Sequence, residues 1–201
     1  QSAGRIQRYL LECNANHEGA FATSQQSDAI LNEAHAAMAD FLNAARPEEI
    51  IFGNNMTTLT LHISRSLART LGPGDEIVVT RLDHDANIAP WLLIAEERGC
   101  KVSWIDFDVE DCTLKLDEFE RAFARKPKLV AFGYASNSVG TINPVRKITE
   151  MAHAAGAMVY VDAVQFAPHG PIDLQALGVD LNAFVFSRGP VQPPDKGDRD
   201  D

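Results

Sequence analysis

Short apolar runs alternate with helical stretches from about residue 50 to residue 186. The runs are continuous, as in Glu76-Ile-Val-Val79 and Met158-Val-Tyr-Val161, and do not alternate apolar with polar residues. Continuous runs of this kind are typical of strands covered on both faces, as in a parallel sheet with crossover helices. We therefore predict an α/β fold in which helices cover both faces of a mostly parallel sheet, in three layers. The predicted strands are 50–52, 76–79, 101–105, 128–132, 158–161 and 181–186.

Apolar rows and capping residues mark the helices. An apolar residue recurs every fourth position from Leu59 to Leu71, which places this row on one helix face. We predict that Asp117 caps a helix and that Asn143-Pro144 begins another, with asparagine as the cap and proline at the first helical position. The first 45 residues predict a helix, a polar loop over residues 14–26 and a second helix.

The last 14 residues differ in composition from the rest of the chain. The segment RGPVQPPDKGDRDD holds three prolines, two glycines and four aspartates. Such a segment cannot bury enough apolar surface to offset the entropy lost on ordering. We predict one partial domain over residues 1–187, followed by a disordered tail over residues 188–201.

Composition and charge narrow the class of function. Hydrophobic residues make up 45% and charged residues 23% of 201 residues, as in an ordinary globular domain. The net charge of −10 argues against a nucleic-acid partner, because phosphate contacts need clustered Lys and Arg. No run is long enough to cross a bilayer, so we expect no membrane partner. The three widely spaced cysteines indicate reduced thiols in a cytoplasmic protein, and no residue cluster has the spacing of metal ligands.

Polar residues follow several predicted strands, at the edge where open parallel sheets bind ligands. Met56 and Thr57 lie between the strand 50–52 and a helix that we expect to begin near Leu59, and a helix N-terminus with a hydroxyl suits a phosphate. Thr57 or Thr58 could instead only cap the helix. Asp162 directly follows the strand 158–161, where a carboxylate needs a cation or hydrogen-bond donors. A protonated ring nitrogen would serve, and capping of the next helix is the alternative.

Three further side chains extend this candidate site. His84 follows the strand 76–79 and could stack on a planar ring or move a proton, or simply lie in solvent. Asn137 could donate to a ring hydroxyl or be a turn residue. Gln165, three residues after Asp162, could reach the same ligand or face solvent. Together the residues predict a pocket for a flat, phosphorylated, basic heterocycle.

Four segments carry a resemblance to a known family. They are FGNNMTTLTLHIS, GDEIVVTRLDHDANIAPW, YASNSVGTINPVRKI and VYVDAVQFAPHGPIDLQALGVD, in this order. Over about residues 10–187 the chain resembles the class V aminotransferases, which use pyridoxal phosphate, and most closely their cysteine desulfurase-like branch. The resemblance implies the large domain of fold type I, pyridoxal 5'-phosphate as cofactor, a small amino-acid substrate and a homodimer.

The resemblance also implies roles around the cofactor ring. Asp162 would pair with the ring nitrogen and keep it protonated, so that the ring withdraws electrons from the substrate. His84 would stack on the ring and act as the catalytic proton-transfer residue. Asn137 and Gln165 would lie near the ring's 3-oxygen.

At the phosphate end, the resemblance implies contacts from Met56, Thr57 and Ser187. In the family, a lysine a few residues beyond the serine that matches Ser187 forms the Schiff base. Here the positions are Arg188-Gly-Pro190. We therefore expect a partial desulfurase-like protein, truncated at both ends relative to the family and inactive, whose parent performs C–S cleavage or amino-group chemistry on cysteine or a similar amino acid. The alternative is a non-catalytic relative that binds or regulates a full-length paralogue.

Overall fold

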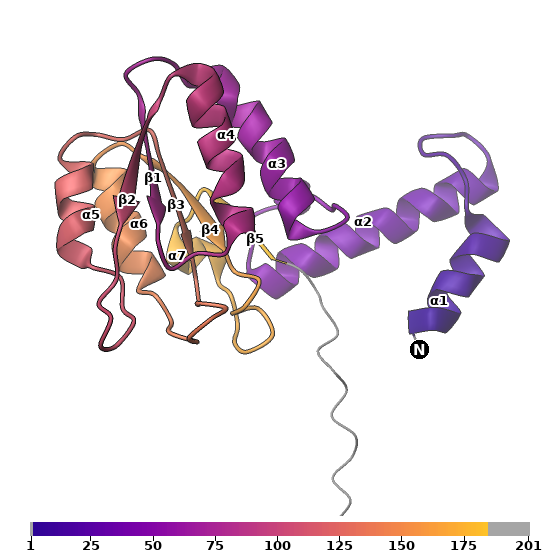
Figure 1. The fold of residues 1–201 in the computed structure, drawn as a ribbon. Helices are drawn as coiled ribbons and strands as arrows, with labels where there is room; N and C mark the ends of the chain where they lie inside the picture. The colour runs from indigo at the N-terminus through magenta and orange to yellow at the C-terminus, as the bar shows by residue number, and fades with distance from the viewer. Residues whose placement is uncertain (1, 185–201) are drawn as a thin grey trace, which may run out of the picture. The chain divides into compact units, whose positions relative to one another are not determined.

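The computed structural model describes residues 2–184, so Ser187, the tail over residues 188–201 and the predicted boundary between them lie outside the described part. The described chain forms two compact units (Figure 1). One unit comprises the described parts of Gln1–Gly53 and Pro171–Val179. The other, larger unit comprises Asn54–Gly170 and the described residues from Asp180 onward.

A parallel sheet of five strands forms the centre of the larger unit. The strands are β1 (Glu76–Thr80), β2 (Lys101–Ile105), β3 (Leu129–Gly133), β4 (Met158–Asp162) and β5 (Leu181–Ala183). Their order is β2-β1-β3-β4-β5, and every neighbouring pair is parallel. The predicted α/β class with a parallel sheet is therefore confirmed. The strand order reverses between β1 and β3, and sheets of this kind bind ligands at such a reversal.

Helices cover both faces of this sheet (Figure 1). They are α3 (Met56–Leu67) and α4 (Ala89–Arg98) on one face, and α5 (Leu116–Phe123) and α6 (Val145–Ala154) on the other. Trp91 of α4 and Tyr160 of β4 are fully buried on the first face, with their ring centroids 4.9 Å apart. On the second face, the Phe119 ring meets the Phe132 ring edge-on at 6.2 Å. The three predicted layers are thus present.

Helix α3 buries polar side chains against the sheet. Met56, Thr60 and Ser64 are buried, whereas the apolar row that begins at Leu59 is half-buried over its helical positions. The most buried face therefore lies one position away from the predicted row. Burial of a hydroxyl is tolerated where it has a partner, and the Thr60 hydroxyl donates to the Met56 carbonyl oxygen at 2.9 Å and lies 2.6 Å from the Tyr160 hydroxyl.

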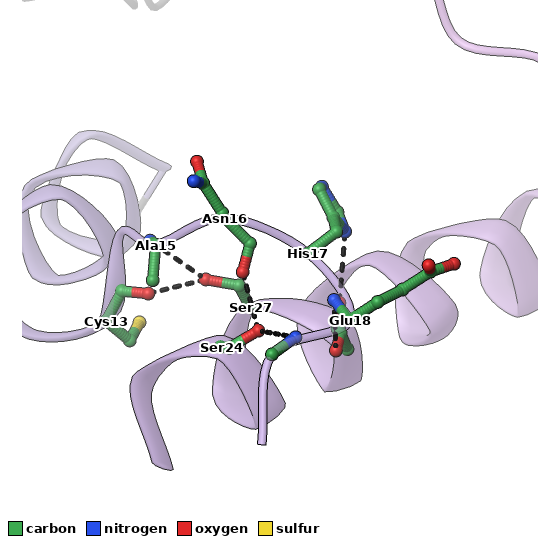
Figure 2. Close-up of polar contacts among 9 residues, drawn as sticks. Cys13, Ala15, Asn16, His17, Glu18, Ser24 and Ser27 are labelled. Atoms are coloured by element: carbon green, nitrogen blue, oxygen red, sulfur yellow. Dashed lines mark hydrogen bonds and ion pairs between the residues drawn. The ribbon is translucent and has the colours of Figure 1, made fainter. Parts of the chain in front are cut away.

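The other unit contains α1 (Ser2–Arg8), a π-helical turn (Tyr9–Cys13), α2 (Ala22–Leu42), a 3₁₀ turn (Pro47–Glu49) and α7 (Leu174–Leu177). Side chains of α2 hold the loop that precedes it (Figure 2). The Ser24 hydroxyl donates to one loop carbonyl and accepts one loop amide. The Ser27 hydroxyl donates to the carbonyl of Cys13, at the end of the π-helical turn, and accepts a loop amide, and Asp28 accepts the Glu18 amide. The predicted loop over residues 14–26 is too long, because Ser24 lies within the helix and bonds the loop from there.

The predicted strand at 50–52 is absent from the described structure. Ile51 and Phe52 are exposed, and neither pairs with a described strand. The Phe52 ring instead contacts the His35 ring of the same unit, with centroids 4.8 Å apart. Three apolar residues are too few to specify a strand without a partner strand beside them.

Two predicted helix caps are also wrong. Helix α5 begins at Leu116, so Asp117 lies inside its first turn, where it pairs with Arg121 at 2.9 Å. The Asn143 side chain donates to the Gly133 carbonyl oxygen at 2.8 Å and does not cap α6, and Pro144 precedes the first helical residue. Neither side chain therefore caps an amide at the start of its helix. No helix in the described part of the chain is long and apolar enough to span a bilayer.

Candidate functional site

A pocket with a cavity volume of about 230 Å³ lies in the larger unit, at the carboxyl ends of β1, β3 and β4. Its walls come from the start of α3 and from the segments that directly follow these three strands. Of the predicted site residues it collects Met56, Thr57, His84, Asn137, Asp162 and Gln165. Ser187 lies outside the described residues. The chain thus brings six predicted residues to one place, while their roles toward a ligand remain predictions.

The N-terminus of α3 forms one wall of the pocket. The Asn55 side chain accepts the Thr58 amide at 2.9 Å, so Asn55 caps this 12-residue helix, not Thr57 or Thr58. The helix also begins earlier than predicted, at Met56 and not near Leu59. The amides of Met56 and Thr57 donate to no acceptor in the described part of the chain, and the Thr57 side chain is exposed. Two unfilled amides and a hydroxyl at the positive end of a helix dipole suit an anionic group such as a phosphate.

His84 stands in the turn that follows β1, at the start of a 3₁₀ turn over Asp85–Asn87. Its Nδ1 accepts the Ala86 amide at 3.0 Å. A neutral ring with an accepting Nδ1 carries its proton on Nε2. The imidazole is exposed and can therefore exchange that proton with a ligand or with water.

Asp162 ends β4 with its carboxyl group on the pocket. Burial raises the pKa of Asp162, while the Val164 amide, which donates to Oδ1 at 2.9 Å, and the nearby charge of His84 lower it. Within the described residues, Asp162 has no ion-pair partner. A half-buried carboxyl with one donor is under-compensated, so the pocket favours a ligand that brings a positive charge or a donor.

Asp83 is a site residue that the sequence analysis did not single out. Its carboxyl accepts from the Thr80 hydroxyl and, at 2.9 Å, from the Asn87 amide. Burial raises the pKa of Asp83 to about 7, and the negative charge of Asp162 adds to the rise, against the lowering effect of its hydrogen bonds. The available signal was the acid directly before His84 in a strand-end loop.

Asn137 and Gln165 lie on the wall of the pocket with exposed side chains. Neither side chain makes a hydrogen bond within the described residues, so the predicted ligand contact and the alternative of a solvent-facing residue both stay open. In residues 2–184, no group of three His, Cys, Asp or Glu side chains is arranged to hold a metal ion.

The model of the aminotransferase class-V family matches residues 3–187. The chain belongs to this family. Among its class V relatives, a probable cysteine desulfurase of Halalkalibacterium halodurans is 43% identical over 145 residues, which cover 72% of this chain and 36% of that protein. An aminotransferase-like protein of Gibberella zeae is 36% identical over 183 residues, covering 90% of this chain and 45% of that protein.

Solved structures of class V cysteine desulfurases share this fold. The apo cysteine desulfurase of Thermococcus onnurineus NA1 matches with a TM-score of 0.84 and 31% identity, over 90% of this chain and 45% of that one. The cysteine desulfurase CsdA of Escherichia coli matches with a TM-score of 0.79 and 30% identity, over 91% and 46% of the two chains. The chain is therefore cysteine desulfurase-like, and it spans less than half the length of these relatives. The family depends on pyridoxal phosphate.

Proposed function

We propose that the pocket at the ends of β1, β3 and β4 binds pyridoxal 5'-phosphate, and that the whole protein uses it on cysteine or a similar amino acid, by C–S cleavage or amino-group chemistry. One observation carries the proposal: the under-compensated Asp162 carboxyl and the unfilled amides of Met56 and Thr57 line the same pocket. A flat ring with a protonated nitrogen and a phosphate satisfies both. When bound, the cofactor supplies a ring that withdraws electrons from the substrate carbon.

The chain's own residues would divide the work around that ring. Asp162 would hold the proton on the ring nitrogen, because an adjacent carboxylate favours the charged form. The amides of Met56 and Thr57, with the Thr57 hydroxyl, would bind the phosphate. His84, whose Nε2 faces away from its bond to Ala86, would cover the ring and move a proton between ligand and solvent. Asn137 and Gln165 would contact the ring oxygen.

The sequence after Ser187 bears on activity. Arg188-Gly-Pro190 stands where the family resemblance implies the Schiff-base lysine. We propose that this chain holds the cofactor without a covalent bond and does not perform the family's reaction. The same substitution favours a second candidate, a non-catalytic partner of a full-length paralogue, which co-purification with such a relative would support. A homodimer of the whole protein completes the proposal.

Binding of 4-deoxypyridoxine 5'-phosphate tests the pocket. This probe keeps the ring nitrogen and phosphate but lacks the aldehyde that reacts with surface lysines. By calorimetry we expect the wild-type chain to bind it, and Asp162→Asn to bind roughly tenfold or more weakly, because a charged hydrogen bond is lost.

Asp85→Asn is the matched control. Asp85 is an exposed acid in the turn that holds His84 but does not line the pocket. This variant removes the same charge and should bind like the wild type. Equal affinity of the wild type and Asp162→Asn, or no binding at all, would overturn the proposal.

A further inference from the structure

Two carboxyl groups, those of Asp83 and Asp162, line the same pocket on either side of β3. Asp162 is the register partner of Gly133 across the β3–β4 ladder. A Cβ atom added to Gly133 would lie 3.0 Å from Oδ1 of Asp83, so the Asp83 carboxyl lies against the main chain of this glycine. The glycine between them thus lets the two acids approach each other from opposite sides of one strand.

Asp83 is held in this position by a chain of buried partners. The Thr80 hydroxyl and the Asn87 amide donate to its two oxygens, and Asn87 in turn accepts the Trp91 indole N–H at 3.2 Å. Thr80, Asn87 and Trp91 are all fully buried. These bonds orient the half-buried Asp83 carboxyl, so its charge, when present, lies beside the pocket.

Ionisation of the two acids is coupled by their proximity. Burial raises the pKa of Asp83 to about 7, and the charge of Asp162 contributes to that rise. The charged groups on this side are Asp162 from β4 and His84 from the turn after β1, and His84 favours the ionised form of Asp162. Near neutral pH, Asp83 gains or loses its charge, and a cation in the pocket would favour the charged form.

We propose that Asp83 is a second acidic positioning residue of this pocket: together with Asp162 it attracts the positive ring nitrogen of the bound ligand, and its ionisation sets the pH range of tight binding. This inference rests on the proposed cofactor site. Asp83 need not touch the ring, since a fixed carboxylate a few ångströms away acts on a cation through the poorly screened interior. Its role differs from that of Asp162, which would bond the ring nitrogen directly.

The ratio of dissociation constants between Asp83→Asn and the wild type isolates this effect. Asparagine can accept the Asn87 donor and pair with the Thr80 hydroxyl, so the substitution removes the charge and keeps the bonds. With 4-deoxypyridoxine 5'-phosphate as the probe, its own ionisation is common to both proteins and cancels in the ratio. We expect a ratio near one at about pH 5, where Asp83 is neutral, rising to roughly tenfold at about pH 8.

The midpoint of that rise should lie close to or below the Asp83 pKa of about 7. The ratio for Asp85→Asn, the exposed acid of the same turn, should stay near one at every pH. A ratio for Asp83→Asn that does not change with pH, while the probe still binds, would overturn this inference and leave the proposed function standing. No binding by the wild type at any pH would overturn both.

A titration of the ligand-free wild type covers the case in which Asp83→Asn fails to fold. Carbon-13 NMR of the aspartate carboxyls should show Asp83 titrating near pH 7, with a clearly lower midpoint in Asp162→Asn because the neighbouring negative charge is gone. If the Asp83 midpoint is the same in both proteins, the Asp83 and Asp162 carboxyls do not interact. That result would overturn the inference without any ligand being used.

Discussion

The hydroxyl pair of Thr60 and Tyr160 joins the helix that begins at the pocket to the strand that ends there. Both residues are fully buried and their hydroxyl oxygens are 2.6 Å apart. Because Thr60 donates to the Met56 carbonyl oxygen, Tyr160 is the donor within the pair. Tyr160→Phe removes only this donor and keeps the edge-on contact with Trp91.

The loss of stability in each variant depends on which buried hydroxyl is left without a hydrogen-bond partner. In Tyr160→Phe the Thr60 hydroxyl keeps its bond to Met56, so the free energy of unfolding should fall by only about 1 kcal/mol. In Thr60→Val the buried Tyr160 hydroxyl loses its acceptor, and the fall should reach about 2 kcal/mol. The double variant removes the same bond once, so the two effects should fall short of additivity by about 1 kcal/mol.

Urea unfolding of the four proteins at one pH measures this cycle. Tyr134→Phe is the matched control, because the half-buried Tyr134 hydroxyl makes no bond within the described residues and its ring stacks on Phe166 with centroids 3.8 Å apart. It should change stability by less than about 0.5 kcal/mol. Additive effects of Tyr160→Phe and Thr60→Val would refute the assigned bond between helix α3 and β4.

Three further variants probe the same sheet. The folded chain keeps the Asp83 proton up to about pH 7, whereas the unfolded chain loses it near pH 4. The free energy of unfolding should therefore fall by up to about 4 kcal/mol between pH 4 and pH 7 and level off above. Asp83→Asn should remove this pH dependence from the midpoints of urea unfolding. Arg125→Ala breaks the 2.7 Å pair with the buried Glu76 and should cost about 1–2 kcal/mol, less than for a fully dry pair because Arg125 is half-exposed; an unchanged midpoint would contradict this. Gly133→Ala places a methyl group 3.0 Å from the Asp83 carboxyl and should cost about 1–3 kcal/mol, with weaker probe binding as a second readout.

The centre of the sheet was predictable from the sequence because β1, β3 and β4 are buried between the two helix layers. From Glu76 onward a strand overlaps every predicted apolar run, since burial on two sides leaves an unbroken run. The last strand, β5, ends at Ala183, and residues 185–186 of the predicted run 181–186 lie outside the described part. The run at 50–52 failed because three apolar residues do not specify a partner, and there the structure provides none among its described strands. The buried row of α3 was missed because Thr60 and Ser64 look like surface residues until their partners are known.

The meeting of the site residues was predictable from topology, because the carboxyl ends of parallel strands share one edge. The position of Asp83 was not. Two aspartates flank His84, and such a charged stretch is typical of a solvated turn. Asp83 is half-buried with its carboxyl against Gly133, fifty residues away in the chain, whereas Asp85 is exposed, and a contact of that range leaves no local trace. The bond from the Asn143 side chain to the Gly133 carbonyl oxygen was missed because an asparagine directly before a proline is equally typical of a helix cap.

The pairing between β1 and β3 is short, and this has a consequence for the sheet as a whole. β1 aligns with β3 through two residue pairs, whereas it aligns with β2 through five, and β3 aligns with β4 through five. The sheet thus consists of two extensively paired parts, β2–β1 and β3–β4, that are joined to each other by a short pairing. Past Val78 the Asp83 side chain, not the main chain, reaches across to β3. A ligand that contacts both His84, after β1, and Asp162, at the end of β4, would link the two parts of the sheet at the end where β1 and β3 are not paired through their main chains.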